Sequence, residues 1–226
     1  AGGFDGVAIG AAVTLQELVD SAELPEPLRR AAGFIPTRSV RNVATIGGNI
    51  ATNRPDSYLI PALIAFGAVA ETPEGELSVE RYVTEERYDL ILSVKVPAPR
   101  GAVLVAKESR SHVALPVVSA AVRLRAASDE PGGGGGSVAG AELRATGPFS
   151  EAIVAAGCVG PHVQRLDSVE RYLLDGGALD GRELEDRVAL AVSPRTDTLG
   201  SAEYKRYING VVIADLLRAC AEEVMR

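Results

Sequence analysis

The sequence predicts a mixed fold in which helices and short antiparallel strands occupy successive stretches of the chain. An apolar run at residues 7–13 is typical of a buried strand, and Thr14 follows it as a helix-capping residue. Short runs with strand-like composition appear from Val69 onward. From Ser201, apolar side chains recur three and four positions apart, as in a long helix. Strands are therefore expected mainly in the middle of the chain, with helices before and after them.

The first part of the chain alternates helices with one glycine-containing turn. Capping residues, prolines and apolar periodicity set the expected ends of each segment. These segments are a helix at residues 15–21, a second helix from Pro25 to about Phe34, a turn at residues 45–53 and a third helix at residues 56–66.

Five strands are predicted after these helices. They are residues 69–71, 76–79, 90–96, 102–109 and 117–125. In the last of them, alternation puts Val122 and Leu124 inside and Arg123 and Arg125 outside. The turn-forming residues 97–101 (PAPRG) are the best candidate for a boundary between two parts of the chain.

The last hundred residues begin with a low-complexity segment and end in helices. Residues 128–137 (SDEPGGGGGS) are predicted to form a flexible hairpin loop, with residues 138–144 as the return strand. No Lys-Ser/Thr pair follows the glycines, which excludes a phosphate-binding P-loop. Helices are expected at residues 168–174, at residues 182–192 and from Ser201. The long helix is predicted to carry an apolar stripe of Tyr204, Tyr207, Ile208, Val211, Val212, Leu216 and Leu217.

Composition argues against several classes of protein. The 226 residues carry a formal net charge of −7, which argues against nucleic acid or an anionic membrane surface as the main partner. No apolar run reaches the roughly 18 residues of a membrane span, and no signal peptide is visible. Cys158 and Cys220 lack metal-ligand spacing, so we expect them to be small, reduced core residues in a cytoplasmic protein with no metal site. Because the chain begins at Ala1, it is expected to be processed or part of a longer chain.

The motif with the clearest chemistry is residues 45–49 (TIGGN). Adjacent glycines let the backbone approach a ligand closely and direct successive N–H groups at an anion. The Thr45 hydroxyl and the Asn49 amide are further donors. A tight turn before a helix is the alternative interpretation, and the five residues alone favour it.

The residues around the motif resemble a known family. Residues 38–51 (RSVRNVATIGGNIA) and 59–63 (LIPAL) are similar to the FAD-binding (medium) subunit of the molybdenum hydroxylases, the xanthine dehydrogenase family. Residues 9–18 (IGAAVTLQEL) resemble the strand and helix that precede the motif there, and residues 201–216 (SAEYKRYINGVVIADL) resemble the closing helix. The Tyr-Lys-Arg-Tyr form is most similar to stand-alone bacterial FAD subunits.

The resemblance implies a two-part α+β flavoprotein. Residues 1–98 would be an FAD-binding domain of the molybdopterin dehydrogenase (PCMH-like) type. Residues 102–226 would be a small antiparallel sheet with a helical bundle, similar to the C-terminal domain of the CO dehydrogenase flavoprotein. The implied cofactor is FAD, and the chain itself would supply no catalytic acid or base. The implied flavin contacts are Thr45, Ile46, Gly47, Gly48, Asn49, Ile91, Leu92 and Lys107.

Each implied contact has a role in the family. Residues 45–49 would contact the diphosphate and the ribityl chain, and Ile91 or Leu92 would lie against the flavin. Lys107 would lie near the isoalloxazine ring, where a cation favours the anionic reduced flavin; a solvated lysine on a strand is the alternative. Where many relatives have an Asp, this chain has Tyr58, and we expect Asp56 to cap the following helix instead.

The family's first flavin loop is expected to be missing. Ala1-Gly-Gly has the letters of that loop but stands directly before the strand at residues 7–13, whereas relatives separate the two by several tens of residues. The small subdomain that carries the loop is therefore expected to be absent from this chain as well.

The remaining charged residues suggest no second site. His112 and His162 are predicted on different strands and form no acid–base pair. Four arginines are expected on solvated faces, with FAD phosphates or a partner subunit as the alternative: Arg29, Arg30, Arg38 and Arg41.

The function that the resemblance implies is electron transfer. Partners would be a molybdopterin-containing large subunit and a [2Fe–2S] small subunit, and FAD would pass electrons to NAD or another acceptor. The lack of cysteine ligands here agrees with clusters on another chain. The alternative is a non-catalytic remnant or fragment that has the fold but does not retain flavin.

Overall fold

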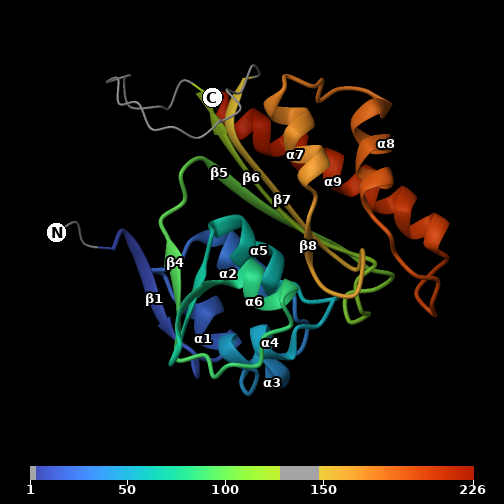
Figure 1. Cartoon of the computed structure of the whole chain (residues 1–226). Helices are drawn as coiled ribbons and strands as arrows, with labels where there is room; N and C mark the ends of the chain where they lie inside the picture. Colours follow the sequence, from blue (N-terminus) through green and yellow to red (C-terminus); the bar gives the residue numbers. More distant parts are fainter. Residues whose placement is uncertain (1–3, 128–147) are drawn as a thin grey trace, which may run out of the picture.

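The computed structural model describes residues 4–127 and 148–226. In these residues, helices join two four-stranded sheets whose strand pairs are all antiparallel (Figure 1). The strand order is β1-β4-β2-β3 in the first sheet and β5-β6-β7-β8 in the second. The α+β prediction is therefore confirmed. None of the helices in these described residues is long and apolar enough to cross a membrane.

The first part of the chain builds the first sheet and the helices beside it. Its elements are β1 (Gly6–Gly10), α1 (Leu15–Asp20), α2 (Glu26–Gly33), α3 (Arg38–Arg41), α4 (Ile46–Thr52), α5 (Leu59–Phe66), β2 (Val69–Thr72), β3 (Gly75–Ser78), α6 (Val79–Thr84) and β4 (Ser93–Pro97). In this sheet β4 pairs with both β1 and β2, so Val94 lies opposite Ile9 and Ala70. Because β1 is an edge strand, Ile9 is its only buried residue. The buried strand predicted at residues 7–13 is therefore shorter and more exposed than expected.

Local capping signals were predicted correctly. The Thr14 hydroxyl accepts a hydrogen bond from the Glu17 N–H at 3.2 Å, and the Glu17 carboxylate accepts one from the Thr14 N–H at 2.7 Å. This reciprocal pair begins α1. Pro25 stands at the start of α2, whose last residue is Gly33.

The second part builds the second sheet and three helices. Its elements are β5 (Ala102–Glu108), β6 (Val118–Ala126), β7 (Phe149–Gly157), β8 (Gln164–Arg165), α7 (Asp167–Leu174), α8 (Arg182–Ala191) and α9 (Ala202–Val224). The chain passes from the first sheet to the second between Pro97 and Ala102. The division into domains at residues 1–98 and 102–226 stays a prediction.

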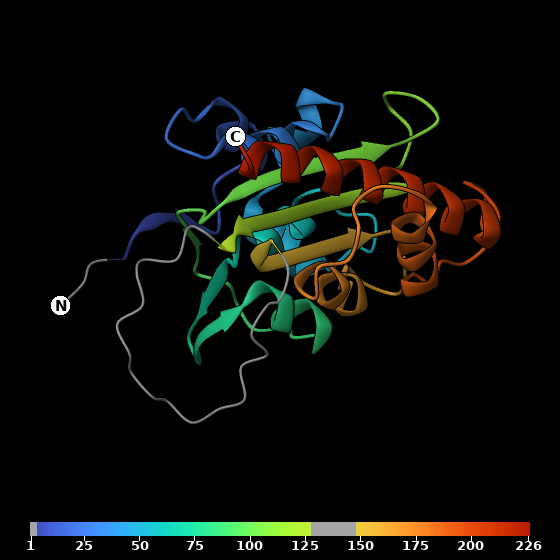
Figure 2. The same cartoon turned by 90° about the horizontal axis from the view of Figure 1, so that it is seen from above.

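Helices cover both faces of the second sheet (Figures 1 and 2). The helices α2 and α5 lie against one face, and α7 and α9 lie against the other. On β6, Val122 and Leu124 pack with the C-terminal helices. Ser119, Ala121 and Arg123 face the first part of the chain. Alternation predicted Arg123 on the outside, but it lies between the two parts of the chain, and only 11% of its side chain is exposed.

Several elements differ from the predictions. Most of the segment predicted as a turn at residues 45–53 forms the helix α4, and the helices α3 and α6 were not predicted. Strand β7 was also missed, because its residues are buried on both faces and show no clear alternation. The loop predicted at residues 128–137 and the strand predicted at residues 138–144 lie outside the described residues.

The buried face of α9 matches the predicted stripe only in part: Leu217 is buried, and Ile208, Val212 and Leu216 are partly buried against the core. Tyr204 and Tyr207 are 43% and 65% exposed. The buried residues are Lys205, Asn209, Gly210, Ile213, Ala214, Leu217, Cys220 and Ala221. Small residues stand on this face because α8 approaches closely: a Cβ on Gly210 would lie 2.8 Å from the Glu185 carbonyl oxygen. Apolarity alone therefore placed the two tyrosines wrongly and missed the buried polar and small residues of the helix.

We expect Gly210→Ala to lower the free energy of unfolding by about 1–3 kcal/mol, because the new methyl group cannot fit against the backbone of α8. Gly33→Ala is the matched control, since a Cβ there would meet only Val19 Cγ2 at an ordinary 3.7 Å. That variant should gain roughly 0.5–1 kcal/mol from helix propensity. Urea unfolding of both variants measures the difference. Equal effects of the two substitutions would contradict the packing argument.

Candidate functional site

The start of α4 is held against the segment that links β1 to α1. The Gly47 N–H donates to the Ala11 carbonyl at 3.0 Å, and the Ile46 N–H donates to the Val13 carbonyl at 3.0 Å. A Cβ on Gly47 would lie 2.7 Å from the Cβ of Ala11. Glycine at position 47 is therefore required for this close approach of two backbones.

The N–H groups at the start of α4 are all used within the chain. The Gly48 N–H donates to the Thr45 hydroxyl at 3.1 Å, and the Asn49 N–H donates to the Thr45 carbonyl at 2.9 Å. Together with the bonds of Ile46 and Gly47, they leave no free N–H group at residues 46–49. The structure therefore differs from the predicted row of N–H groups directed at an anion. Gly48 is the exposed residue of this turn. A Cβ added to Gly48 would have one close neighbour, the Thr45 hydroxyl oxygen at 3.0 Å.

Asn49 is oriented by a hydrogen-bonded serine. The Ser57 hydroxyl donates to Asn49 Oδ1 at 2.8 Å and accepts from the Ile60 N–H at 3.2 Å. The Asn49 amide nitrogen has no partner among the described residues and is left as a donor. Asp56 was expected to cap α5, but Ser57 does so, and Asp56 instead binds the Arg54 guanidinium through both oxygens at 2.7 and 2.8 Å.

Leu92 lies close to the α4 turn, and Ile91 is buried. The Ala11 N–H donates to the Leu92 carbonyl at 3.0 Å, so Ala11 is bonded to both Leu92 and Gly47. The Leu92 side chain is 48% exposed, whereas Ile91 is only 6% exposed. Of the two predicted residues, Leu92 is the one that can contact a ligand at this surface.

Lys107 lies between two aromatic rings. Its ammonium group donates to the Phe34 carbonyl at 3.2 Å and lies 5.5 Å from the centre of the Phe34 ring and 5.6 Å from that of Tyr58. The two rings meet edge to face at 5.8 Å. Because Tyr58 follows Ser57, this cluster connects through that serine to Asn49. Lys107 lies on β5, but its side chain is half-buried and is not fully solvated.

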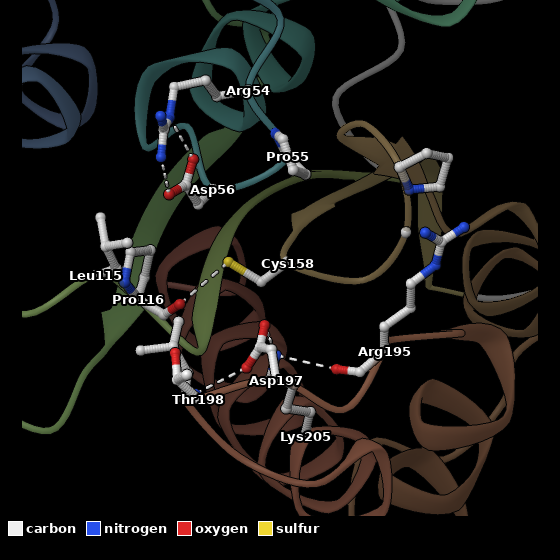
Figure 3. Close-up of a pocket in the computed structure, with 13 residues that line it drawn as sticks. Arg54, Pro55, Asp56, Leu115, Pro116, Cys158, Arg195, Asp197, Thr198 and Lys205 are labelled. Carbon is white, nitrogen blue, oxygen red and sulfur yellow. Dashed lines mark hydrogen bonds and ion pairs between the residues drawn. The ribbon is translucent and has the colours of Figure 1, made fainter.

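A cavity of about 640 Å³ opens beyond Asp56, where four loops meet (Figure 3). Its lining residues are Arg54, Pro55, Asp56, Leu115, Pro116, Cys158, Gly160, Pro161, Arg195, Asp197, Thr198, Leu199 and Lys205. The Cys158 thiol is directed at the Pro116 carbonyl at 3.4 Å. Lys205 pairs with Asp197 at 2.5 Å on the opposite wall. Sequence reasoning missed this cavity because its residues come from loops far apart in the chain.

The two cysteines differ in position but not in chemistry. Cys220 is buried, as predicted, whereas Cys158 is only partly buried and has a left-handed backbone with φ of 63°. Burial raises the pKa of each thiol to about 12. Both thiols are therefore protonated near neutral pH, and Cys158 is not a nucleophile in the cavity.

Arginines of the first part are mainly structural. Arg41 donates to the Gln16 side chain at 2.8 Å and to the Ile35 carbonyl at 2.5 Å, and Arg29 donates to the Val19 carbonyl at 3.2 Å. These two side chains tie helices together, which differs from the solvated faces predicted for them. Arg30 and Arg38 are exposed, as predicted.

The two histidines lie outside the helices and strands that the structure describes. His112 and His162 lie in loops, whereas the sequence predicted them on strands. In residues 4–127 and 148–226, no group of three or more His, Cys, Asp or Glu side chains could hold a metal ion.

Sequence comparisons point to flavoproteins. Residues 3–99 match the model of a family described as the FAD-binding domain in molybdopterin dehydrogenase. The uncharacterized protein YgfM of Escherichia coli, from strains K12 and O157:H7, is 37% identical over 215 residues. This similarity covers 95% of the chain and 73% of YgfM.

Solved structures share the fold. A chain of the cyanide-inactivated Cu,Mo-CO dehydrogenase is 22% identical with a TM-score of 0.76, covering 99% of this chain and 78% of its own. A chain of the Hydrogenophaga pseudoflava CO dehydrogenase that lacks the Mo-pyranopterin moiety is 24% identical with a TM-score of 0.75, covering 99% and 77%. A chain of quinoline 2-oxidoreductase from Pseudomonas putida 86 is 17% identical with a TM-score of 0.75, covering 100% of this chain and 78% of its own.

We expect both cysteines to resist alkylation. With pKa values of about 12, the thiols should react with iodoacetamide at pH 8 at least about a hundredfold more slowly than free cysteine. The rate should continue to rise with pH beyond pH 10, because the thiolate fraction is still increasing there. Mass spectrometry of each cysteine measures this, with the urea-unfolded chain as the control. Fast labelling of folded Cys158 at pH 8 would contradict the burial argument.

Proposed function

The chain belongs to the family of FAD-binding subunits of the molybdopterin dehydrogenases, and from this we propose that it is the electron-transfer flavoprotein of a multisubunit molybdenum hydroxylase. The cofactor of the family is FAD. Substrate is oxidised at a molybdopterin centre on a large subunit, and [2Fe–2S] clusters on a small subunit carry electrons to this chain. From here the electrons pass to NAD or another acceptor.

The residues at the α4 turn fit the flavin dinucleotide. Gly48 is exposed, and the Asn49 amide nitrogen has no partner among the described residues. Leu92, whose carbonyl is bonded to the Ala11 N–H, has a half-exposed apolar side chain. Lys107 supplies a cation at the other end of the Asn49–Ser57–Tyr58 connection. A diphosphate and a ribityl chain require a hydrogen-bond donor and a close approach to the backbone, and an isoalloxazine ring requires an apolar wall and a cation.

Bound FAD would supply reversible electron transfer, which no amino-acid side chain in the site provides. The residues of this chain have the supporting roles. Asn49 donates a hydrogen bond, Gly48 permits close contact, and Leu92 shields one side from water. The positive charge of Lys107 lowers the energy of an electron-rich ring beside it.

The division of labour between subunits agrees with the cysteine content. A [2Fe–2S] cluster is held by four cysteine thiolates in its commonest form, and the whole sequence contains only Cys158 and Cys220. Cys158 directly follows β7 and Cys220 lies on α9, and each thiol is bonded to a separate carbonyl. A cluster donor on another chain is therefore part of the proposal.

The cavity beyond Asp56 is the proposed entry for the electron acceptor. Its volume of about 640 Å³ is within the range of small-molecule sites. Asp56 is separated from the α4 helix by only a few residues, so the cavity adjoins the proposed flavin site. Two of its lining cations are paired, Arg54 with Asp56 and Lys205 with Asp197. Arg195 is therefore the lining charge that suits an acceptor with negative charge, such as a dinucleotide.

The match of residues 3–99 to the FAD-binding model is the observation that carries the proposal. Titration of the purified chain with FAD, followed by quenching of flavin fluorescence, tests its first half. Copurification with chains that bear molybdopterin and iron–sulfur cofactors tests its second half. A chain that takes up no FAD would instead be a remnant with the fold alone. A flavin-loaded chain without such partners would overturn only the subunit assignment.

We expect two neighbouring glycine variants to fail in different ways. Gly48→Ala should still fold, with the Thr45 hydroxyl displaced slightly from the 3.0 Å contact that a Cβ would make. It should weaken FAD binding about tenfold or more, because the new methyl group occupies the surface offered to the ligand. Gly47→Ala should lower the free energy of unfolding, because its Cβ would lie 2.7 Å from that of Ala11. Urea unfolding and FAD titration separate the two effects. Gly33→Ala is the control, and it should lower neither the free energy of unfolding nor the FAD affinity. Unaltered FAD affinity of Gly48→Ala would contradict the placement of the flavin at this turn.

A further inference from the structure

Lys107 differs from the other lysines in how its charge is held. The sequence contains three lysines. Lys95 pairs with Glu76 at 2.5 Å, and Lys205 pairs with Asp197 at 2.5 Å. Among the described residues, no carboxylate lies within ion-pair distance of Lys107. Its partners are the Phe34 carbonyl and two aromatic rings.

Three separate elements bring these groups together. Phe34 ends α2, Tyr58 precedes α5, and Lys107 lies near the end of β5. Lys107 stands directly opposite Ser119 of β6, and the Ser119 hydroxyl donates to the Ser57 carbonyl at 2.8 Å. The opposed pair on the sheet therefore fixes the Ser57–Tyr58 backbone and the lysine in one place. The cluster is built by the fold and not by a chance contact of surface side chains.

Aromatic rings hold a cation without cancelling its charge. The negative face of each ring attracts the ammonium group, but the ring itself carries no net charge. A carboxylate in the same place would neutralise the lysine and screen its field. The Tyr58 phenol stays neutral, since burial raises its pKa to about 12. Arg30, 5.9 Å from the centre of the Phe34 ring, adds a second cation and no anion.

We propose that Phe34 and Tyr58 are positioning residues that hold Lys107 as an unneutralised cation for the flavin ring. This inference rests on the proposed function, because it assigns the flavin as the group that uses the charge. The two rings act through Lys107 and raise the reduction potential of the bound flavin. They do not themselves transfer electrons or protons.

The first measurement needs no flavin. Acylation of the three lysine amines, followed residue by residue by mass spectrometry, reports how firmly each is held. Phe34→Leu and Tyr58→Leu should raise the Lys107 labelling rate about threefold or more, while Lys95 and Lys205 keep theirs. Tyr58→Phe is the matched control, because it keeps the ring and removes only the hydroxyl. Unchanged Lys107 labelling in both leucine variants would overturn the proposed cluster.

The second measurement is the reduction potential of bound FAD. Phe34→Leu, Tyr58→Leu and Lys107→Gln should each shift it to more negative values, and Tyr58→Phe and Lys107→Arg should not. In the Lys107→Gln background, Phe34→Leu should cause no further shift, because its effect passes through the lysine. A purely structural role of the rings would not produce this non-additivity, so equal shifts in both backgrounds would overturn the inference.

The two possible failures are distinguishable. If the wild-type chain binds no FAD, the proposed function fails and the inference fails with it. If the chain binds FAD but neither ring variant moves the potential, the inference fails and the proposed function stands. Phe34 is only partly buried, so Phe34→Leu keeps the test valid even if Tyr58→Leu does not fold.

Discussion

The backbone contact between Gly47 and Ala11 is the constraint on which the candidate site depends. Gly47 donates to the Ala11 carbonyl, and Ala11 donates to the Leu92 carbonyl, each at 3.0 Å. These two hydrogen bonds join the start of α4, the end of β1 and the segment before β4. The approach is possible because Gly47 has no Cβ, which would lie 2.7 Å from that of Ala11. A larger residue at either position would separate α4 from Leu92 and divide the surface that the three segments form.

The second sheet supports the other end of the site. Both of its faces are buried, since helices pack against each. From the face toward the first part of the chain, Ser119 holds the Ser57 carbonyl and Lys107 contacts the Tyr58 ring. Ser57 in turn orients Asn49. The α4 turn and Lys107 are therefore connected through one short segment, and movement of the two parts of the chain relative to one another would disturb both ends together.

Local signals in the sequence were sufficient for much of the fold but not for the site geometry. The capping box at Thr14 and the helix after Pro25 depend on neighbouring residues, so they could be predicted. The part of the buried face of α9 around Gly210 could not be predicted, because the close approach of α8 selects a small residue there and hydrophobicity does not reveal it. The motif at residues 45–49 was recognised, but two of its N–H groups donate to Ala11 and Val13, which lie more than thirty residues away. The rings around Lys107 likewise come from three elements, and no spacing in the sequence relates them.

Charge explains why the proposed cofactor site needs this arrangement. FAD is an anion, and the chain carries a net charge of −7, so long-range attraction does not favour binding. The N–H groups of α4 are already bonded within the chain, and Arg54 is already paired with Asp56 at 2.7 Å. Affinity at the turn must then come from close contact at Gly48 and the neutral donor of Asn49. A net positive field has to come from a cation that no carboxylate neutralises, and in the described residues around the Ser57–Tyr58 segment Lys107 meets that condition.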